Sequence, residues 1–167
     1  DKIKSTEIID LDNENSDCQS FEYPLRAKNI QGGVLHSSGN TKAIFCGGLG
    51  SGPDNEEIKA CYEFGASGFN ETAISTLTYG TKYEASVVQT FSTPAVQEQF
   101  IWITGGLDKN NEIRKSIQLV SLNGIVFEGP GMVEGIYEHC VVALSYKSVM
   151  VIGGKTSSNY QYNARFL

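Results

Sequence analysis

The sequence has no cluster of Lys or Arg, and its 13 basic residues are outnumbered by 19 acidic ones, which gives a net charge of −6. A nucleic acid backbone would meet repulsion instead of counterion release, so nucleic acid is not an expected partner. An anionic membrane surface is disfavoured for the same reason, and no apolar run approaches the roughly 20 residues of a membrane span. No signal-peptide pattern stands at Asp1, so we expect this residue to be a processed end or a cut.

Residues that favour helices are also scarce. Ala, Leu and Met are sparse, whereas Thr, Ser, Val, Ile, Tyr and Phe are abundant, and 18 glycines are more than a helical protein would tolerate. No window long enough to form a stable helix shows helical periodicity. With 40% apolar and 19% charged residues, the 167-residue chain has the composition of a globular domain with its own core. The sequence therefore predicts an all-β protein.

A short apolar run that ends in a glycine pair occurs three times. The first glycines of successive pairs lie 58 and then 48 residues apart. A recurrence of roughly 50 residues is typical of a four-stranded propeller blade, in which a buried strand is followed by a sharp outward turn. The repeat-defining pairs are Gly47-Gly48, Gly105-Gly106 and Gly153-Gly154.

The segments between the glycine pairs follow one order: an inner strand, the strand that ends in the pair, a loop, a third strand, a turn and an outer strand. Residues 83–88 align with residues 137–142 in this order, as YEASVV with YEHCVV. The predicted strands are 4–11, 18–25, 31–38, 41–48, 58–64, 69–77, 83–91, 99–106, 115–122, 125–128, 137–144, 149–154 and 159–167.

The glycine pairs, the loops after them and an aromatic residue after the third strand (Phe69, with Phe21 and Phe127 in other copies) resemble the kelch-repeat family, over almost the whole chain. The family's usual tryptophan at that last place is phenylalanine here. Its usual tyrosine of the third strand is Tyr62 in one copy, whereas Ile9 or Val120 stands there in the others.

The resemblance implies a kelch-type β-propeller forming an incomplete ring of about three four-stranded blades. Residues 1–27 would supply the outer strands of one blade, 28–82 and 83–136 two full blades, and 137–167 the first strands of a further blade. A closed propeller needs at least about four blades. The remainder would come from a longer chain, from a second copy or from another polypeptide; we favour the longer chain.

The four cysteines have no CxxC spacing, so a structural zinc site is not expected. Cys46 ends the second strand of a blade and Cys61 lies in its third strand, where antiparallel neighbours are close enough for a disulfide. We expect a Cys46–Cys61 bridge; the alternative is two buried free thiols. Cys18 and Cys140 belong to other blades, where they are available to cysteines outside this chain. Asn70 begins the single N-glycosylation sequon, Asn70-Glu71-Thr72.

Three further groups of residues could carry chemistry but favour a plainer interpretation. The glycine-rich segment 47–52 follows a strand but lacks the following helix and Lys-Ser or Lys-Thr of a phosphate loop. The acidic stretch before Phe21 has neither the glycine at the sixth place nor the glutamate at the twelfth place of an EF-hand loop, so it favours an acidic turn that faces water. Two histidines are too few for a metal site and are expected to face a channel or solvent. These acidic and histidine residues are Asp10, Asp12, Glu14, Asp17, His36 and His139.

We therefore expect a non-catalytic, extracellular module that binds a protein through the loops 49–57, 107–114 and 155–159, without a cofactor. The alternative is an intracellular kelch adaptor with reduced thiols. A copper-radical oxidase also uses a kelch-type propeller and needs a cysteine crosslinked to a tyrosine. Cys61 and Tyr62 are adjacent in a strand and point to opposite faces, so that crosslink is not expected here.

Overall fold

The computed structural model describes residues 5–8, 19–22, 27–28, 30–37, 40–50, 57–65, 68–70, 72–92, 97–145, 148–157 and 164–166. Within these ranges every regular element is a β-strand, so the predicted all-β class is confirmed. A search of the same residues for a helix of membrane-spanning length and hydropathy finds none. The strands are β1 (Ser5–Ile8), β2 (Gln19–Glu22), β3 (Ala27–Lys28), β4 (Gln31–Ser37), β5 (Asn40–Cys46), β6 (Leu49–Gly50), β7 (Ala60–Gly65), β8 (Gly68–Phe69), β9 (Ser75–Thr76), β10 (Ala85–Ser92), β11 (Gln97–Thr104), β12 (Ile117–Ser121), β13 (Val126–Glu128), β14 (Cys140–Ser145), β15 (Ser148–Ile152) and β16 (Ala164–Phe166).

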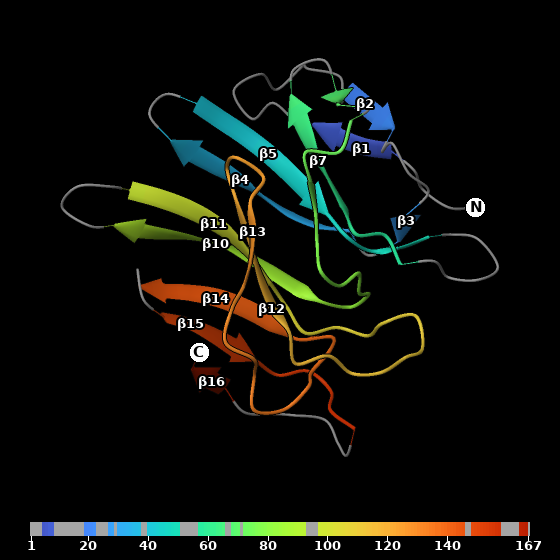
Figure 1. The fold of residues 1–167 in the computed structure, drawn as a ribbon, viewed down its shortest axis with the longest axis vertical. Helices are drawn as coiled ribbons and strands as arrows, with labels where there is room; N and C mark the ends of the chain where they lie inside the picture. The colour runs from blue at the N-terminus through green and yellow to red at the C-terminus, as the bar shows by residue number, and fades with distance from the viewer. Residues whose placement is uncertain are drawn as a thin grey trace.

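Three antiparallel sheets make up most of the described structure. The first sheet has the strand order β4-β5-β7-β8, with β9 also paired to β7. The second sheet has the order β10-β11-β12-β13, and the third has the order β14-β15-β16. Figure 1 shows the leading hairpins of the three sheets, β4–β5, β10–β11 and β14–β15, stacked in chain order from top to bottom. Two smaller pairs, β1 with β2 and β3 with β6, complete the described strands.

The strand before each glycine pair has the same register in all three sheets. Its last residue pairs with the first residue of the preceding strand: Cys46 with Gln31, Thr104 with Ala85, and Ile152 with Cys140. The following glycines adopt matching positive backbone angles, with φ of 70° and 94° in the first sheet, 63° and 92° in the second, and 67° and 97° in the third. L-residues rarely adopt these angles, which explains why glycine stands at each place.

A bridge beside each glycine pair fixes which residues of the three sheets are equivalent. The bridged pairs are Lys28 with Leu49, Lys82 with Leu107, and Tyr137 with Lys155.

This equivalence corrects the sequence alignment of residues 83–88 with residues 137–142 by one position. Tyr83 is equivalent to Glu138, not to Tyr137, and these two residues share a positive φ of 58° and 52°. The register also makes Gln118, not Val120, the equivalent of Tyr62 in the third strand. Tyr62 pairs with Phe45 and Gln118 pairs with Ile103, and Phe45 and Ile103 are equivalent residues of the first and second sheets.

Each sheet has two faces. We call the one on the side of the next sheet in chain order the forward face, and the opposite one the backward face. The forward face of the first sheet, with Leu35 and Ile44, packs on Ile101 and Ile103 of the second. The forward face of the second sheet, with Trp102, packs on the backward face of the third. Burying these aliphatic side chains between sheets supplies the main stabilising term of the fold.

Two predicted strands differ from the structure. Residues 69–77 do not form one strand, because β8 ends at Phe69 and β9 covers only Ser75–Thr76. Residues 137–139 precede the third sheet instead of opening it, since β14 starts at Cys140. The segment after β8 stays bonded to β7 through single hydrogen bonds, such as Asn70 N to Glu63 O (2.8 Å), whereas Glu138 N donates to Tyr83 O (2.8 Å), a residue that precedes β10.

Candidate functional site

The loop that follows the second glycine pair is built around one buried carboxylate. Asp108 is 1% exposed, and one of its oxygens accepts hydrogen bonds from the amides of Asn110 (2.8 Å) and Glu112 (2.9 Å). Its other oxygen pairs with the guanidinium of Arg114. The backbone closes the same turn, because Asn111 N donates to Asp108 O (3.0 Å) and Asp108 N donates to Glu112 O (3.1 Å). The loop is therefore held from inside by a single side chain.

These contacts decide the protonation of Asp108. Burial alone would raise its pKa, but the amides of Glu112 and Asn110 and the charge of Arg114 outweigh burial, so the pKa lies below its ordinary value. The carboxylate stays ionised at neutral pH. The tip of the loop, residues 109–112, is exposed to solvent on this fixed base.

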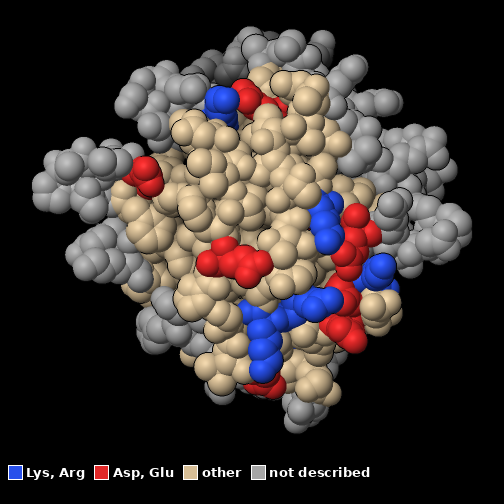
Figure 2. Space-filling view, viewed as in Figure 1, with Lys and Arg blue, Asp and Glu red and all other residues tan. Residues whose placement is uncertain are grey.

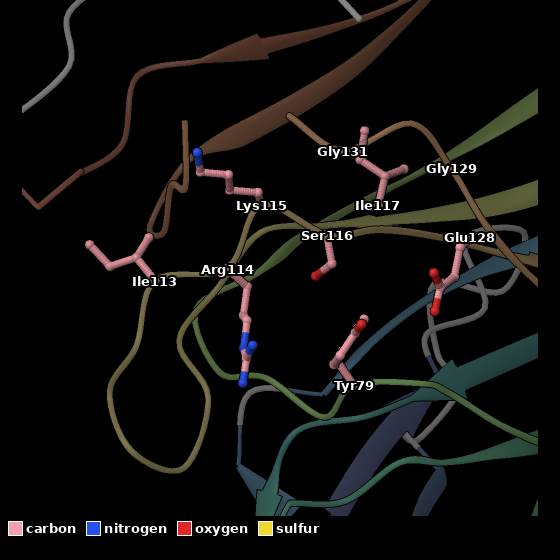
Figure 3. Close-up of a pocket in the computed structure, with 9 residues that line it drawn as sticks. All are labelled: Tyr79, Ile113, Arg114, Lys115, Ser116, Ile117, Glu128, Gly129 and Gly131. Carbon is pink, nitrogen blue, oxygen red and sulfur yellow. The ribbon is translucent and has the colours of Figure 1, made fainter. Parts of the chain in front are cut away.

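A cavity of about 390 Å³ opens beside the base of this loop. In Figure 3 the side chains of Arg114, Ser116, Tyr79 and Glu128 surround an open space, whereas Lys115 points away from it. The Arg114 guanidinium lies over the Tyr79 ring, with its Cζ 5.4 Å from the ring centroid, which fixes both side chains by a cation–π contact. The full lining is Tyr79, Ile113, Arg114, Lys115, Ser116, Ile117, Glu128, Gly129 and Gly131.

A buried glutamine brings the tyrosine to this cavity. Gln118, in β12, is 1% exposed; its Nε2 donates to Tyr79 O (3.0 Å) and its Oε1 accepts from Tyr79 N (3.1 Å). The segment after β9 is thus tied to the second sheet by two hydrogen bonds at one residue. Removal of the Gln118 amide would leave the backbone N–H and C=O of Tyr79 without these hydrogen bonds, and an unsatisfied buried polar group costs about 1–3 kcal/mol.

The cavity offers both donors and acceptors of hydrogen bonds. The Nε of Arg114 is buried and makes no hydrogen bond with any described residue, so it remains a donor. The Ser116 hydroxyl and the Glu128 carboxylate add further polar groups, and the Asp108 carboxylate offsets the charge of Arg114. A mixed polar lining of this kind suits neutral polar groups, such as the backbone and amide side chains of a protein loop.

The surface around the site is of mixed sign. Figure 2 shows Lys and Arg side chains interleaved with Asp and Glu along one side of this face, while the other side carries few charges. Among the described residues, ion pairs join Arg114 to Glu112 (4.0 Å) and Lys155 to Glu138. The described residues of this face form no large single-sign field that would select a highly charged ligand.

The structure joins Cys46 and Cys61 in a disulfide, with their Cα atoms 4.0 Å apart across β5 and β7. Both residues are fully buried against the second sheet. Cys140 is a free, exposed thiol at the start of β14. Cys18 lies outside the described residues, as do the acidic residues at 10–17, residues 51–52 of the glycine-rich segment 47–52, and residues 51–56 of the loop 49–57.

Other predicted site residues are spread over the structure. Asn70 is exposed directly after β8, and its Oδ1 accepts a hydrogen bond from Thr72 N (3.0 Å). His36 lies in β4, where its backbone pairs with Thr41. Among the described residues no three His, Cys, Asp or Glu side chains gather as metal ligands would.

Two buried titratable groups were not predicted, and they occupy equivalent places in the second and third sheets. Glu84, directly before β10, is 6% exposed and lies near Gly47 of the first sheet; His139, directly before β14, is 7% exposed and lies near Gly105 of the second. The expectation that His139 faces a channel or solvent is therefore wrong. It is buried, and its Nε2 lies 2.7 Å from the hydroxyl of Thr104.

Burial shifts the pKa of each group in the direction that favours its neutral form. The pKa of Glu84 rises from 4.5 to about 8 because of desolvation, against weaker opposing hydrogen bonds from its own amide and from Thr81. The pKa of His139 falls from 6.5 to about 4, also because of desolvation. Both side chains are consequently neutral at pH 7.

Neither a known protein family nor a curated protein matches this sequence significantly. The resemblance to kelch repeats therefore stays a prediction that rests on the sequence motifs.

Proposed function

We propose that this chain is part of a kelch-type β-propeller that binds a protein partner through the loops after its glycine pairs, without catalysis. The matched registers, glycine angles and bridges of the three sheets support the propeller. Each sheet repeats the same connection to the next one, which is how blades follow each other around a ring. Further blades would come from the same longer chain or from another subunit.

The observation that carries the binding role is the loop 107–114. Its exposed tip, residues 109–112, presents one lysine, two asparagines and one glutamate on a base fixed by the buried Asp108. A loop held rigid before binding loses little conformational entropy on binding, so its contacts contribute more fully to affinity. The cavity beside Arg114 and Tyr79 would receive a side chain of the partner next to this tip.

We further propose an extracellular location, with Asn70 as a glycosylation site. The Cys46–Cys61 bridge supports this, because disulfides persist in oxidising compartments and are rare in the cytosol. The exposed Asn70 is accessible to a glycan. An intracellular adaptor would instead keep both thiols reduced. Mass spectrometry after alkylation without reductant tests this: native protein with Cys46 and Cys61 both alkylated would contradict the extracellular proposal.

The binding role is tested with an array of purified secreted proteins and cell-surface ectodomains, probed with the labelled chain. The loop variant Lys109→Ala/Asn110→Ala/Glu112→Ala changes only exposed side chains and keeps Asp108. The matched control is Asn123→Ala, in the exposed turn at the other end of β12. We expect a partner whose affinity falls at least about tenfold with the loop variant and is unchanged with the control. Equal binding by the loop variant, or an array without a partner, would contradict the proposal.

A further inference from the structure

The cavity beside the loop 107–114 is large enough for a ligand of its own. Its volume of about 390 Å³ falls in the range of about 300–1,000 Å³ that is typical of small-molecule sites. A water molecule takes up about 30 Å³ in the liquid, so the few non-hydrogen atoms of an amide side chain fill only part of this volume. The cavity therefore fits a group larger than one polar side chain of a protein partner.

Polar side chains from three separate segments face this cavity with their oxygen atoms. Figure 3 shows the hydroxyl of Tyr79, the hydroxyl of Ser116 and the carboxylate of Glu128 around the same open space. Tyr79 follows β9, Ser116 directly precedes β12, and Glu128 is the last residue of β13. A hydroxyl both donates and accepts hydrogen bonds, whereas an ionised carboxylate only accepts them. A matching ligand therefore carries several hydrogen-bond donors.

Arg114 supplies donors to the cavity and is held in place before a ligand binds. Asp108 pairs with its guanidinium from inside the loop, and the Tyr79 ring packs against it, with the ring centroid 5.4 Å from Cζ. Gln118 fixes the backbone of Tyr79 by two hydrogen bonds. Side chains that are ordered in the free protein lose little conformational entropy on binding, so their hydrogen bonds contribute more fully to affinity.

The charges of the lining disfavour an ionic ligand. An anion would meet the carboxylate of Glu128 and would gain little from Arg114, because the buried Asp108 already offsets the charge of the guanidinium. A cation would meet the guanidinium itself. An apolar ligand would displace water from the polar side chains without replacing the lost hydrogen bonds, which is unfavourable. A neutral ligand with many hydroxyl groups avoids all of these penalties.

The rest of the lining suits the carbon skeleton of such a ligand. Ile113 and Ile117 are apolar, and Gly129 and Gly131 have no side chain that would fill the space. A Cβ at Gly129 would lie only 2.8 Å from the Ile117 side chain, which explains why glycine stands there. A sugar ring carries C–H groups on its faces and hydroxyl groups around its edge, so it matches the apolar and the polar parts of the lining together.

We propose that this cavity binds one ring of a neutral saccharide, with Glu128 accepting hydrogen bonds from its hydroxyl groups and Arg114 donating to them. The inference deepens the proposed function and rests on it for the source of the saccharide, which is a glycan on the extracellular partner. The partner side chain that enters the cavity next to the exposed loop tip then carries this glycan. Free saccharides should bind as well, because the whole lining belongs to this chain.

Ligand-observed NMR titration of the purified chain with free saccharides tests the inference. The probes are the methyl glycosides of glucose, galactose, mannose, fucose, N-acetylglucosamine and N-acetylgalactosamine. We expect at least one of them to bind with a Kd of about 1–10 mM, the affinity usual for a ligand of about twelve non-hydrogen atoms. A Kd weaker than about 50 mM for every probe overturns the inference.

Two variants and two matched controls locate the bound saccharide. Tyr79→Phe removes only a hydroxyl from the cavity, and Tyr83→Phe removes one from an exposed tyrosine before β10, outside the lining. Glu128→Gln removes a charge from the lining, and Glu98→Gln does the same at an exposed position in β11. We expect Tyr79→Phe to weaken binding at least about threefold and Glu128→Gln at least about tenfold, with both controls unchanged. Saccharide binding that both cavity variants leave unchanged lies elsewhere and overturns the inference.

Two further probes test the class of ligand. Glucuronate adds a negative charge to the same kind of ring, and propionamide represents an amide side chain. We expect glucuronate to bind at least about tenfold more weakly than the best neutral glycoside, because its charge meets Glu128, and propionamide to bind more weakly still. Equal or tighter binding of either probe overturns the assignment to a neutral saccharide.

The two proposals fail separately. The protein array and the loop variant at Lys109, Asn110 and Glu112 use no free saccharide. A protein partner that depends on the loop tip while no glycoside binds would contradict the saccharide site alone. A glycoside that binds in the cavity while the array yields no partner would contradict the protein partner and leave the saccharide site standing.

Discussion

The buried carboxyl of Glu84 makes the stability of this protein depend on pH in an unusual direction. Folding raises its pKa from 4.5 to about 8, so the folded state holds a proton that the unfolded state releases between these values. Stability is therefore fully present below pH 4.5 and is lost as the pH rises through about 8. Each unit by which the pKa of Glu84 is displaced changes the free energy of unfolding by about 1.4 kcal/mol. The whole displacement therefore gives an upper limit of about 5 kcal/mol.

The histidine at the equivalent place works in the opposite direction. Folding lowers the pKa of His139 from 6.5 to about 4, so its contribution is present above pH 6.5 and is lost as the pH falls through about 4. Between pH 4.5 and 6.5 the two effects oppose each other and nearly cancel. Above pH 6.5 only Glu84 still titrates, and we expect the free energy of unfolding to fall by about 2 kcal/mol between pH 6.5 and 8.

Glu84→Gln removes the titration and keeps the shape of the side chain. We expect the variant to show no fall in unfolding free energy between pH 6.5 and 8, and to exceed the wild type in stability at pH 8.5. The assay is urea unfolding at several pH values, followed by the fluorescence of Trp102, the single tryptophan, which is 8% exposed between the second and third sheets.

The control for this prediction is Glu98→Gln, which makes the same substitution at an exposed position in β11 and should follow the wild type. A wild-type protein whose stability is constant from pH 6.5 to 8.5 would refute the reasoning. So would a Glu84→Gln variant that loses stability as steeply as the wild type. Either result would mean that water reaches this carboxyl in the folded protein.

The remaining predictions use the same unfolding assay. The Glu84→Gln protein should lose stability as the pH falls from 6.5 to 4, because His139 then takes up a proton on unfolding. Adding His139→Gln to this protein should abolish that loss, and a loss that persists would assign the titration to another group. Replacing Cys46 and Cys61 together by serine should cost about 3 kcal/mol, the loop-closure value for a separation of 15 residues, and an unchanged urea midpoint would show that the bridge adds no stability. Gly106→Ala should destabilise the fold by about 1–3 kcal/mol, because φ is +92° and the added Cβ would lie 2.8 Å from Lys82 O.

The glycine pairs could be predicted from the sequence because they are forced by backbone geometry. A sharp turn at positive φ admits few residues other than glycine, so the same letters recur wherever the same turn is made. The continuous apolar runs before the pairs follow from burial on both faces between neighbouring sheets. These two signals were enough to place the central strands of all three sheets within one to three residues of their observed ends.

The register between repeats could not be predicted, because the strongest local match was misleading. Tyr-Glu occurs at 83–84 and at 137–138, yet the bridges of Lys82 with Leu107 and Tyr137 with Lys155 show that the equivalence is displaced by one residue. A displacement of one residue exchanges the two faces of a strand. With the alignment taken from the letters, Val142 would fall on the face that packs against the second sheet, whereas in the structure Val141 lies there and Val142 is 41% exposed.

The buried polar residues escaped prediction for a different reason: their place is determined by the fold, while their chemistry is not. Ile30, Glu84 and His139 occupy one equivalent position, directly before the first strand of each sheet. A nonpolar residue, an acid and a base share no sequence pattern, so only the structure relates them. In the second and third sheets this position reaches the glycine pair of the preceding sheet, where little space is left for water. A titratable residue there must be neutral to be accommodated, and this couples the contact between consecutive sheets to the protonation of one side chain.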